Sequence, residues 1–160
     1  MRRSRHVPID RVFSGNATND TAFADLGAPD LKLEGLQIWV HGRQFPDLHD
    51  YWDGNWLRTT AHRGGSGASV FTTGTIIHLP ELDRWRSEAE DLLKDLGGEA
   101  KLACMEPFLS ASPKSGSLGR ITVEVSITPD HMTQRNWFQF EIDQSYLPPF
   151  IKQCQSIFEA

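Results

Sequence analysis

Residues 118–128 read Leu-Gly-Arg-Ile-Thr-Val-Glu-Val-Ser-Ile-Thr, and this stretch decides the fold class. Apolar and polar residues alternate along it, which is the period of a β-strand with one face in a core and the other in water. Residues 137–143, Trp-Phe-Gln-Phe-Glu-Ile-Asp, repeat the alternation. Because antiparallel sheets commonly have one solvated face, whereas parallel sheets are covered on both, the two stretches predict an antiparallel sheet.

Four more segments towards the N-terminus have the β-branched and aromatic composition of strands: residues 31–41, 56–62, 68–78 and 100–109. The apolar phase of the first segment slips at Gly35, which predicts a β-bulge or a bend at that glycine. The glycine-rich residues 63–67 predict a hairpin turn. Residues 110–117 contain Pro113 and Gly116 and therefore predict a loop.

Two segments show the apolar period of a helix. The first begins at Pro80 and ends at Gly97. Its apolar stripe comprises Leu82, Trp85, Ala89, Leu92, Leu93 and Leu96. The second begins near Pro148, and its stripe contains Cys154, which we expect to be buried. The element order β-β-β-α-β-β-β-α predicts an α+β domain, with an antiparallel sheet of about six strands and two helices packed on one face.

The chain divides into two parts. Residues 1–30 lack periodicity and are rich in Asn, Asp, Thr, Gly and Pro, so we expect a flexible N-terminal arm. Residues 31–160 have the size and apolar content of a single α+β domain. No apolar region follows the basic start, no stretch is long enough to cross a bilayer, and the two cysteines form no paired motif. These features predict a cytoplasmic protein with reduced thiols and no membrane partner.

Charge is unevenly distributed along the chain. The formal net charge is -5, and residues 1–11 hold four Arg and one Asp, so the remaining residues carry -8. An acidic body disfavours nucleic acid as the main ligand, because it repels phosphates. The same charge suits a basic protein partner, and it equally serves solubility.

Residues 42–56 have the most unusual composition. Aspartates recur there at every third position: Asp47, Asp50 and Asp53. Oxygen ligands grouped in this way could hold Ca²⁺ or Mg²⁺, but the spacing does not fit an EF-hand loop. The alternative is a turn in which the carboxylates cap backbone amides while Tyr51, Trp52 and Trp56 pack under the sheet. We favour the turn, and therefore expect neither a metal nor another cofactor.

No sequence feature predicts catalysis. Residues 64–68, Gly-Gly-Ser-Gly-Ala, lack the last glycine of a nucleophile elbow and join two strands. No motif places Cys104 next to His78 or His131. Carboxylates on the predicted outward strand faces are solvated, whereas a catalytic acid needs burial or a close charge. We therefore expect a binding protein and not an enzyme.

Several motifs resemble one family. They are Gly42-Arg43-Gln44-Phe45-Pro46, Asp50-Tyr51-Trp52-Asp53-Gly54-Asn55-Trp56-Leu57, Glu106-Pro107-Phe108-Leu109, and the strand at residues 138–142 with the helix that follows it. From about residue 31 onwards the chain is similar to the WapI-like immunity proteins of bacterial contact-dependent toxin systems. The resemblance implies a small cytosolic protein that binds a cognate toxin domain and blocks it. In the type case the toxin is a nuclease that acts on tRNA.

Acidic residues of the body are the candidate contacts for such a toxin: Asp47, Asp50, Asp53, Glu124 and Glu141. They would complement a cationic nuclease and speed its encounter with this chain. Two other functions stay open. A non-catalytic ligand-binding or assembly module would have an apolar pocket with convergent polar groups. An enzyme would have a buried carboxylate or thiol beside a histidine in a cleft.

Overall fold

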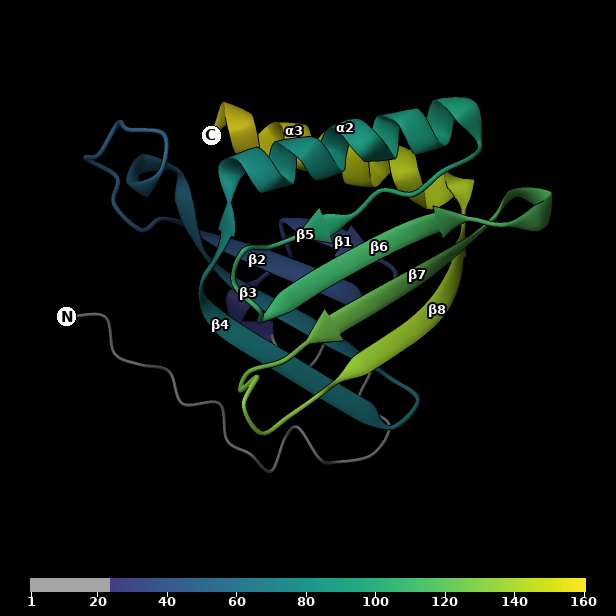
Figure 1. Cartoon of the computed structure of the whole chain (residues 1–160), viewed down its shortest axis with the longest axis horizontal. Coiled ribbons are helices and arrows are strands. Elements are labelled where there is room, and N and C mark those ends of the chain that lie inside the picture. The colour runs from purple at the N-terminus through teal and green to yellow at the C-terminus, as the bar shows by residue number, and fades with distance from the viewer. Residues whose placement is uncertain (1–23) are drawn as a thin grey trace.

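The computed structural model describes residues 24–160, which form two antiparallel four-stranded sheets and two α-helices (Figure 1). The first sheet comprises β1 (Leu31–Leu33), β2 (Leu36–Arg43), β3 (Trp56–Gly65) and β4 (Ala68–His78), in that order. The second comprises β5 (Leu102–Ala103), β6 (Leu109–Ser115), β7 (Arg120–Ile127) and β8 (Trp137–Asp143). Each strand pairs with its neighbour in the sequence, so both sheets are meanders.

Helix α2 (Leu79–Asp95) connects the two sheets, and α3 (Leu147–Glu159) follows the second sheet. Short 3₁₀ turns occur at η2 (Ala24–Leu26), η3 (Asp53–Asn55), η4 (Ser117–Gly119) and η5 (Gln144–Tyr146). The two α-helices lie next to each other along one side of the molecule, at the top of Figure 1. There α2 packs against α3 and β5, and α3 packs against β1. Within residues 24–160, no helix has both the length and the apolar character needed to cross a membrane.

One hydrophobic core is enclosed by both sheets and both helices. The alternation of β7 places Ile121, Val123, Val125 and Ile127 in this core, as the sequence predicts. Between the helices, Trp85 and Phe150 meet edge to face with their ring centroids 4.5 Å apart. Both rings are buried, and such pairs stabilise a core beyond the area that they remove from water.

The α+β class and the antiparallel pairing are confirmed, but two sheets with eight strands replace the expected single sheet of about six. The segment 31–41 is a hairpin in which Leu33 pairs with Leu36, and Glu34 in its two-residue turn has a φ of 53°. The prediction of a bulge or bend at Gly35 is therefore wrong, because the slip in apolar phase comes from a turn. A register shift does occur in β2, between Val40 and Gly42.

The loop expected at residues 110–117 is largely strand β6, and this prediction is also wrong. Its inward residues Leu109, Ala111 and Pro113 are buried. Pro113 lies opposite Val123, and its carbonyl accepts a hydrogen bond from the Ala100 N–H at 2.9 Å. Proline removes a single donor, and the other backbone groups of β6 keep the strand paired. Serine, proline and lysine are depleted in strands, which hides this one in the sequence.

Both expected helices are confirmed, at Leu79–Asp95 and Leu147–Glu159. Leu96 departs from the expected stripe: it is exposed and has a φ of 49°, because a left-handed residue ends the helix at that point. Cys154 is buried as expected, and burial raises the pKa of its thiol to about 12.

The expected arm at residues 1–30 lies largely outside the described residues, which begin at Ala24. Hydrogen bonds, among them one from the Asp30 N–H to the Ile38 carbonyl at 2.9 Å, join the segment before β1 to β2. The Trp39 indole N–H donates to the Gly27 carbonyl at 3.0 Å, and the Val40 N–H donates to the Asp30 carboxylate at 2.6 Å. This short segment is thereby attached to the first sheet.

A histidine lies buried within the first sheet. His62 of β3 has its Nδ1 3.2 Å from the Gln37 amide oxygen and its Nε2 2.8 Å from the Ser69 hydroxyl. An amide oxygen only accepts, so Nδ1 carries the hydrogen and Nε2 accepts from the hydroxyl. This arrangement suits the neutral imidazole. Burial, and then the positive charge of Arg63, lower the pKa of His62 to about 4.

We predict that His62 makes the protein less stable in mild acid. The unfolded chain protonates this histidine near pH 6.5, whereas the folded chain does so only near pH 4. Its contribution to the unfolding free energy is present above pH 6.5 and is lost as the pH falls towards 4, by about 2 kcal/mol. Urea denaturation at about pH 7.5 and about pH 4.5 measures this loss. Between these two pH values, the unfolding free energy of the variant His62→Gln should fall by about 2 kcal/mol less than that of the wild type. If the unfolding free energy falls equally in both proteins, groups other than His62 cause the acid sensitivity.

Candidate functional site

The β2–β3 loop, residues 44–55, projects from one end of the first sheet, at the upper left of Figure 1. Two hydrogen bonds close its base. The Gln44 N–H donates to the Trp56 carbonyl at 2.8 Å, and the Thr75 hydroxyl donates to the Gln44 side-chain oxygen at 2.9 Å. The loop therefore leaves the sheet from a fixed starting point.

Asp50 organises the turn inside the loop. Its Oδ1 accepts hydrogen bonds from the Trp52 N–H at 3.0 Å and from the Asp53 N–H at 2.7 Å. This confirms the capping role predicted for Asp50. The carboxylates of Asp47 and Asp53 are exposed and form no hydrogen bond or ion pair with other described residues. Their negative charges are open to solvent or to a partner.

The polypeptide also crosses itself closely within the loop. Gly54 is buried, and a Cβ at this position would lie 2.6 Å from the Leu48 carbonyl oxygen. The Asn55 side-chain amide donates to the Tyr51 carbonyl at 2.9 Å. These contacts make the loop compact. Glycine is required at position 54 because the backbone at Leu48 lies too close for a side chain.

His78, at the junction of β4 and α2, anchors the loop to the body. Its Nε2 lies 3.0 Å from both the Tyr51 and the Trp52 carbonyl oxygens. Carbonyls only accept, so this nitrogen carries a hydrogen and donates to the loop. The imidazole is stacked on Trp52, with centroids 5.5 Å apart and planes inclined by 16°. Tyr51 and Trp56 contact the same ring at 5.5 and 5.0 Å.

The prediction that Tyr51 and Trp52 pack under the sheet is wrong. Each is 57% exposed, and Phe45 and Leu48 of the same loop are 44% and 41% exposed. The inner faces of the sheets are already filled, so the loop places its rings against His78 and leaves the rest in solvent. Phe45, Leu48, Tyr51 and Trp52 together form an exposed apolar group that we call the loop patch.

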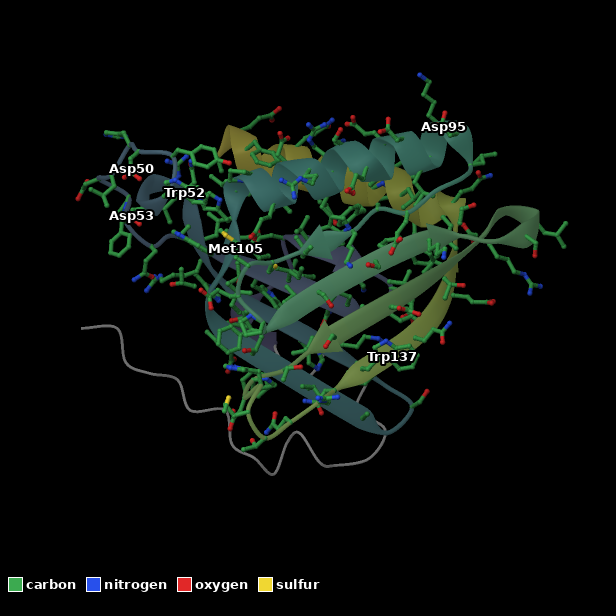
Figure 2. All side chains as sticks on the ribbon, viewed as in Figure 1. Asp50, Trp52, Asp53, Asp95, Met105 and Trp137 are labelled. Atoms are coloured by element: carbon green, nitrogen blue, oxygen red, sulfur yellow. The ribbon has the colours of Figure 1, made fainter. Side chains whose placement is uncertain are left out.

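Glu81 links the backbone at His78 to the chain after α2. Its Oε2 accepts from the His78 N–H at 3.0 Å, and its Oε1 accepts from the Met105 N–H at 2.9 Å. Met105 is exposed and lies on the same side of the molecule as Trp52 (Figure 2). Burial, and then the negative charge of Glu81, raise the pKa of Cys104, so its thiol stays protonated and is a poor nucleophile.

Glu124 and Glu141, the other two predicted contacts, lie on a different surface. They occupy the outward face of β7 and β8, where Glu124 is opposite Gln139 and Glu141 is opposite Thr122. The exposed ring of Trp137 belongs to the same face of β8. The structure thus places the three predicted aspartates on one loop and the two glutamates on the outward face of the second sheet.

A candidate location for the ligand-binding alternative lies between the two helices. An open groove between α2 and α3 has a volume of about 470 Å³ and is lined by Glu90, Leu93, Lys94, Pro148, Ile151, Lys152 and Gln155. Its two lysines are exposed, and the Glu90 carboxylate is already paired with Arg86 at 2.8 Å, so few free polar groups are left to hold a ligand at one point. Among the described residues, no three His, Cys, Asp or Glu side chains are grouped closely enough to hold a metal ion.

Sequence reasoning identified the loop but missed His78 and Met105. The start of α2 at Pro80 places His78 at a helix N-terminus, and nothing local connects it with Trp52, which lies 26 positions earlier. The exposure of the loop rings was also missed, because an aromatic-rich segment is more often buried than exposed.

Comparison with known proteins gives one match. The model of the family described as "Immunity protein WapI-like family" matches residues 30–160, which covers both sheets and both helices. No curated protein and no solved structure matches the chain significantly.

We predict that the loop depends on the glycine at position 54. In Gly54→Ala the new methyl group would meet the Leu48 carbonyl, so the backbone must move. We expect the unfolding free energy to fall by about 1–3 kcal/mol and amide exchange to accelerate in residues 48–55. The matched control is Gly97→Ala, where a Cβ would come no closer than 3.7 Å to its neighbours. Equal exchange rates in the two variants would show that the loop does not need this close approach.

Proposed function

The chain belongs to the WapI-like immunity protein family, and from this we propose that it binds a cognate toxin domain and blocks that domain's activity. The match over residues 30–160 is the observation that carries the proposal. The proposed place of action is the cytoplasm of the bacterium that makes both proteins. The proposed mode of action is binding, with no chemical step performed by this chain.

Features of the candidate site support binding. The loop patch is a group of large apolar side chains in contact with water, and such groups commonly mark protein–protein contact sites. The loop that carries it is held by His78, Asp50 and the contact at Gly54, so little further ordering is needed on association. A protonated Cys104 thiol argues against nucleophilic catalysis near this site.

Charge supports the nature of the proposed toxin. Outside residues 1–11, the formal net charge is -8, since the whole chain carries -5 and those residues carry +3. A toxin that cleaves tRNA must bind phosphates and therefore presents a basic surface. An acidic inhibitor is attracted to that surface, associates with it rapidly and competes with the RNA for it. We therefore propose a nuclease as the target.

The alternative of a ligand-binding or assembly module would use the groove between α2 and α3. This groove is open, and Lys94 and Lys152 among its lining residues are exposed. Pockets that hold small molecules are usually concave and bury most of the ligand. The loop patch has more of the features of a binding site than this groove has, and toxin binding is accordingly our first proposal.

We predict that the chain protects cells from the toxin encoded beside its own gene. The toxic domain of that protein, expressed alone, should stop growth and cleave tRNA. Co-expression of this chain should restore growth and leave the tRNA intact, because the complex hides the basic surface of the toxin. A toxin from an unrelated system serves as the control and should not be neutralised. Continued killing, with this chain folded and abundant, would contradict the proposal.

A further inference from the structure

We propose that the β2–β3 loop is the surface that holds the toxin, and that it receives an arginine-bearing basic patch of that partner. This inference rests on the proposed function and adds to it a location and a chemistry. Three features carry it: one open face of the Trp52 indole, unpaired carboxylates beside it, and a rigid loop. Figure 2 shows Asp50, Trp52 and Asp53 grouped on this loop.

The geometry of three rings leaves one face of Trp52 uncovered by them. His78 is stacked on one side of the indole at 5.5 Å. Tyr51 lies 4.9 Å from Trp52 and 5.5 Å from His78, and it is nearly perpendicular to both. If Tyr51 covered the opposite face of Trp52, its distance from His78 would be about the sum of the other two distances. Tyr51 therefore lies beside the stack and does not cover the outer face of Trp52, a residue that is 57% exposed.

Three carboxylates lie on the same loop as this ring. Asp47 and Asp53 are exposed without a partner among residues 24–160, and Asp50 uses only its Oδ1 in capping. Residues 44–55 contain no Lys or Arg. The adjacent Arg43 directs its guanidinium to the Gly54 carbonyl, 3.3 Å away, and not to a carboxylate. A cation approaching the loop thus meets three negative charges and no fixed positive one within these residues.

Arginine is the side chain that uses both features at once. Its planar guanidinium stacks on an aromatic face, and its N–H groups pair with a carboxylate. A lysine ammonium would satisfy the charge but would use the flat ring less fully. Nucleic acid fits poorly, because its phosphates would be repelled by the same carboxylates. The partner face that fits is therefore a protein surface with arginine near its centre.

The outward face of β7 and β8 fits this role less well. It carries Glu124, Glu141 and the exposed Trp137, but Arg120 and Lys114 are exposed on the same face of the sheet. Charges of both signs are therefore interspersed there, and a basic patch would meet repulsion as well as attraction. This face supplies matched control residues for testing the loop.

The first test compares two exposed tryptophans. Trp52 and Trp137 are 57% and 58% exposed, and Figure 2 places them on different parts of the molecule. The dissociation constant is measured by calorimetry against the toxin domain encoded beside this gene. We expect Trp52→Ala to weaken binding at least about 30-fold, as at the centre of an interface, and Trp137→Ala to leave it nearly unchanged. The reverse result would overturn the inference and place the toxin on the second sheet.

The second test concerns charge. The triple variant Asp47→Asn, Asp50→Asn, Asp53→Asn removes three charges and keeps an acceptor oxygen at the Asp50 cap. The control has the same change in net charge at exposed acids after the middle of α2 and in the chain that follows it: Asp91→Asn, Asp95→Asn and Glu99→Gln. We expect the loop variant to associate about 10-fold more slowly at low salt, with a much smaller difference in high salt. Equal rates for the two triple variants would overturn the assignment of this role to the loop.

A third test does not require the toxin. A short peptide of arginines, added to the ¹⁵N-labelled chain, should shift the indole N–H resonance of Trp52 more than that of Trp137. A lysine peptide of equal length should shift it less. A single-stranded RNA that moved Trp52 as strongly would overturn the chemistry proposed for the partner. If the wild-type chain fails to bind the toxin, the proposed function fails; if it binds and Trp52→Ala binds equally well, only the present inference fails.

Discussion

The buried His78 imidazole holds the projecting loop to the body of the protein. It lies where β4 becomes α2, so its position is fixed by a strand on one side and a helix on the other. From there it donates to two loop carbonyls and supports the rings of Tyr51 and Trp52. Without this residue the loop would keep its internal contacts and the hydrogen bonds at its base, but the rings of Tyr51 and Trp52 would lose the imidazole that they pack against. The position of the Trp52 ring, on which the proposed contact centres, therefore depends on this side chain.

That constraint explains how large apolar residues remain in water without destabilising the fold. The core is complete without them, because both sheets and both helices enclose it and Trp85 with Phe150 fills the space between the helices. The loop patch therefore contributes little to folding stability, and its exposed area is available for association. Asp50 and Gly54 complete the arrangement by closing the turn in which Trp52 stands.

The sequence predicts those features of the structure that depend on residues close together in the chain, and fails for contacts between distant residues. The strict alternation of apolar and polar residues predicted β7 and β8 and each of their inward-facing residues correctly. The helical spacing of apolar residues predicted α2 and α3. Two predictions were wrong: a bulge or bend was expected at Gly35, where the chain makes a hairpin turn, and a loop was expected around Pro113, which lies in a strand. In both places the local composition favours one structure, and the strand pairing in the folded protein imposes another. The loop was recognised as the unusual segment, but its contact with His78 joins residues 26 and 27 positions apart, and no local pattern encodes such a contact.

The exposed residues of the loop and the buried residues that hold its shape are different residues, and this affects how an immunity protein can change its target. Substitution at Trp52 or Asp53 alters exposed side chains that are not part of the hydrophobic core. Substitution at His78 or Gly54 alters buried positions on which the shape of the loop depends. A protein built in this way can acquire a different binding specificity through its exposed loop residues while the two sheets and the anchoring histidine stay the same. Family membership therefore indicates the scaffold, and under the function proposed above the exposed residues of the loop would decide which toxin is recognised.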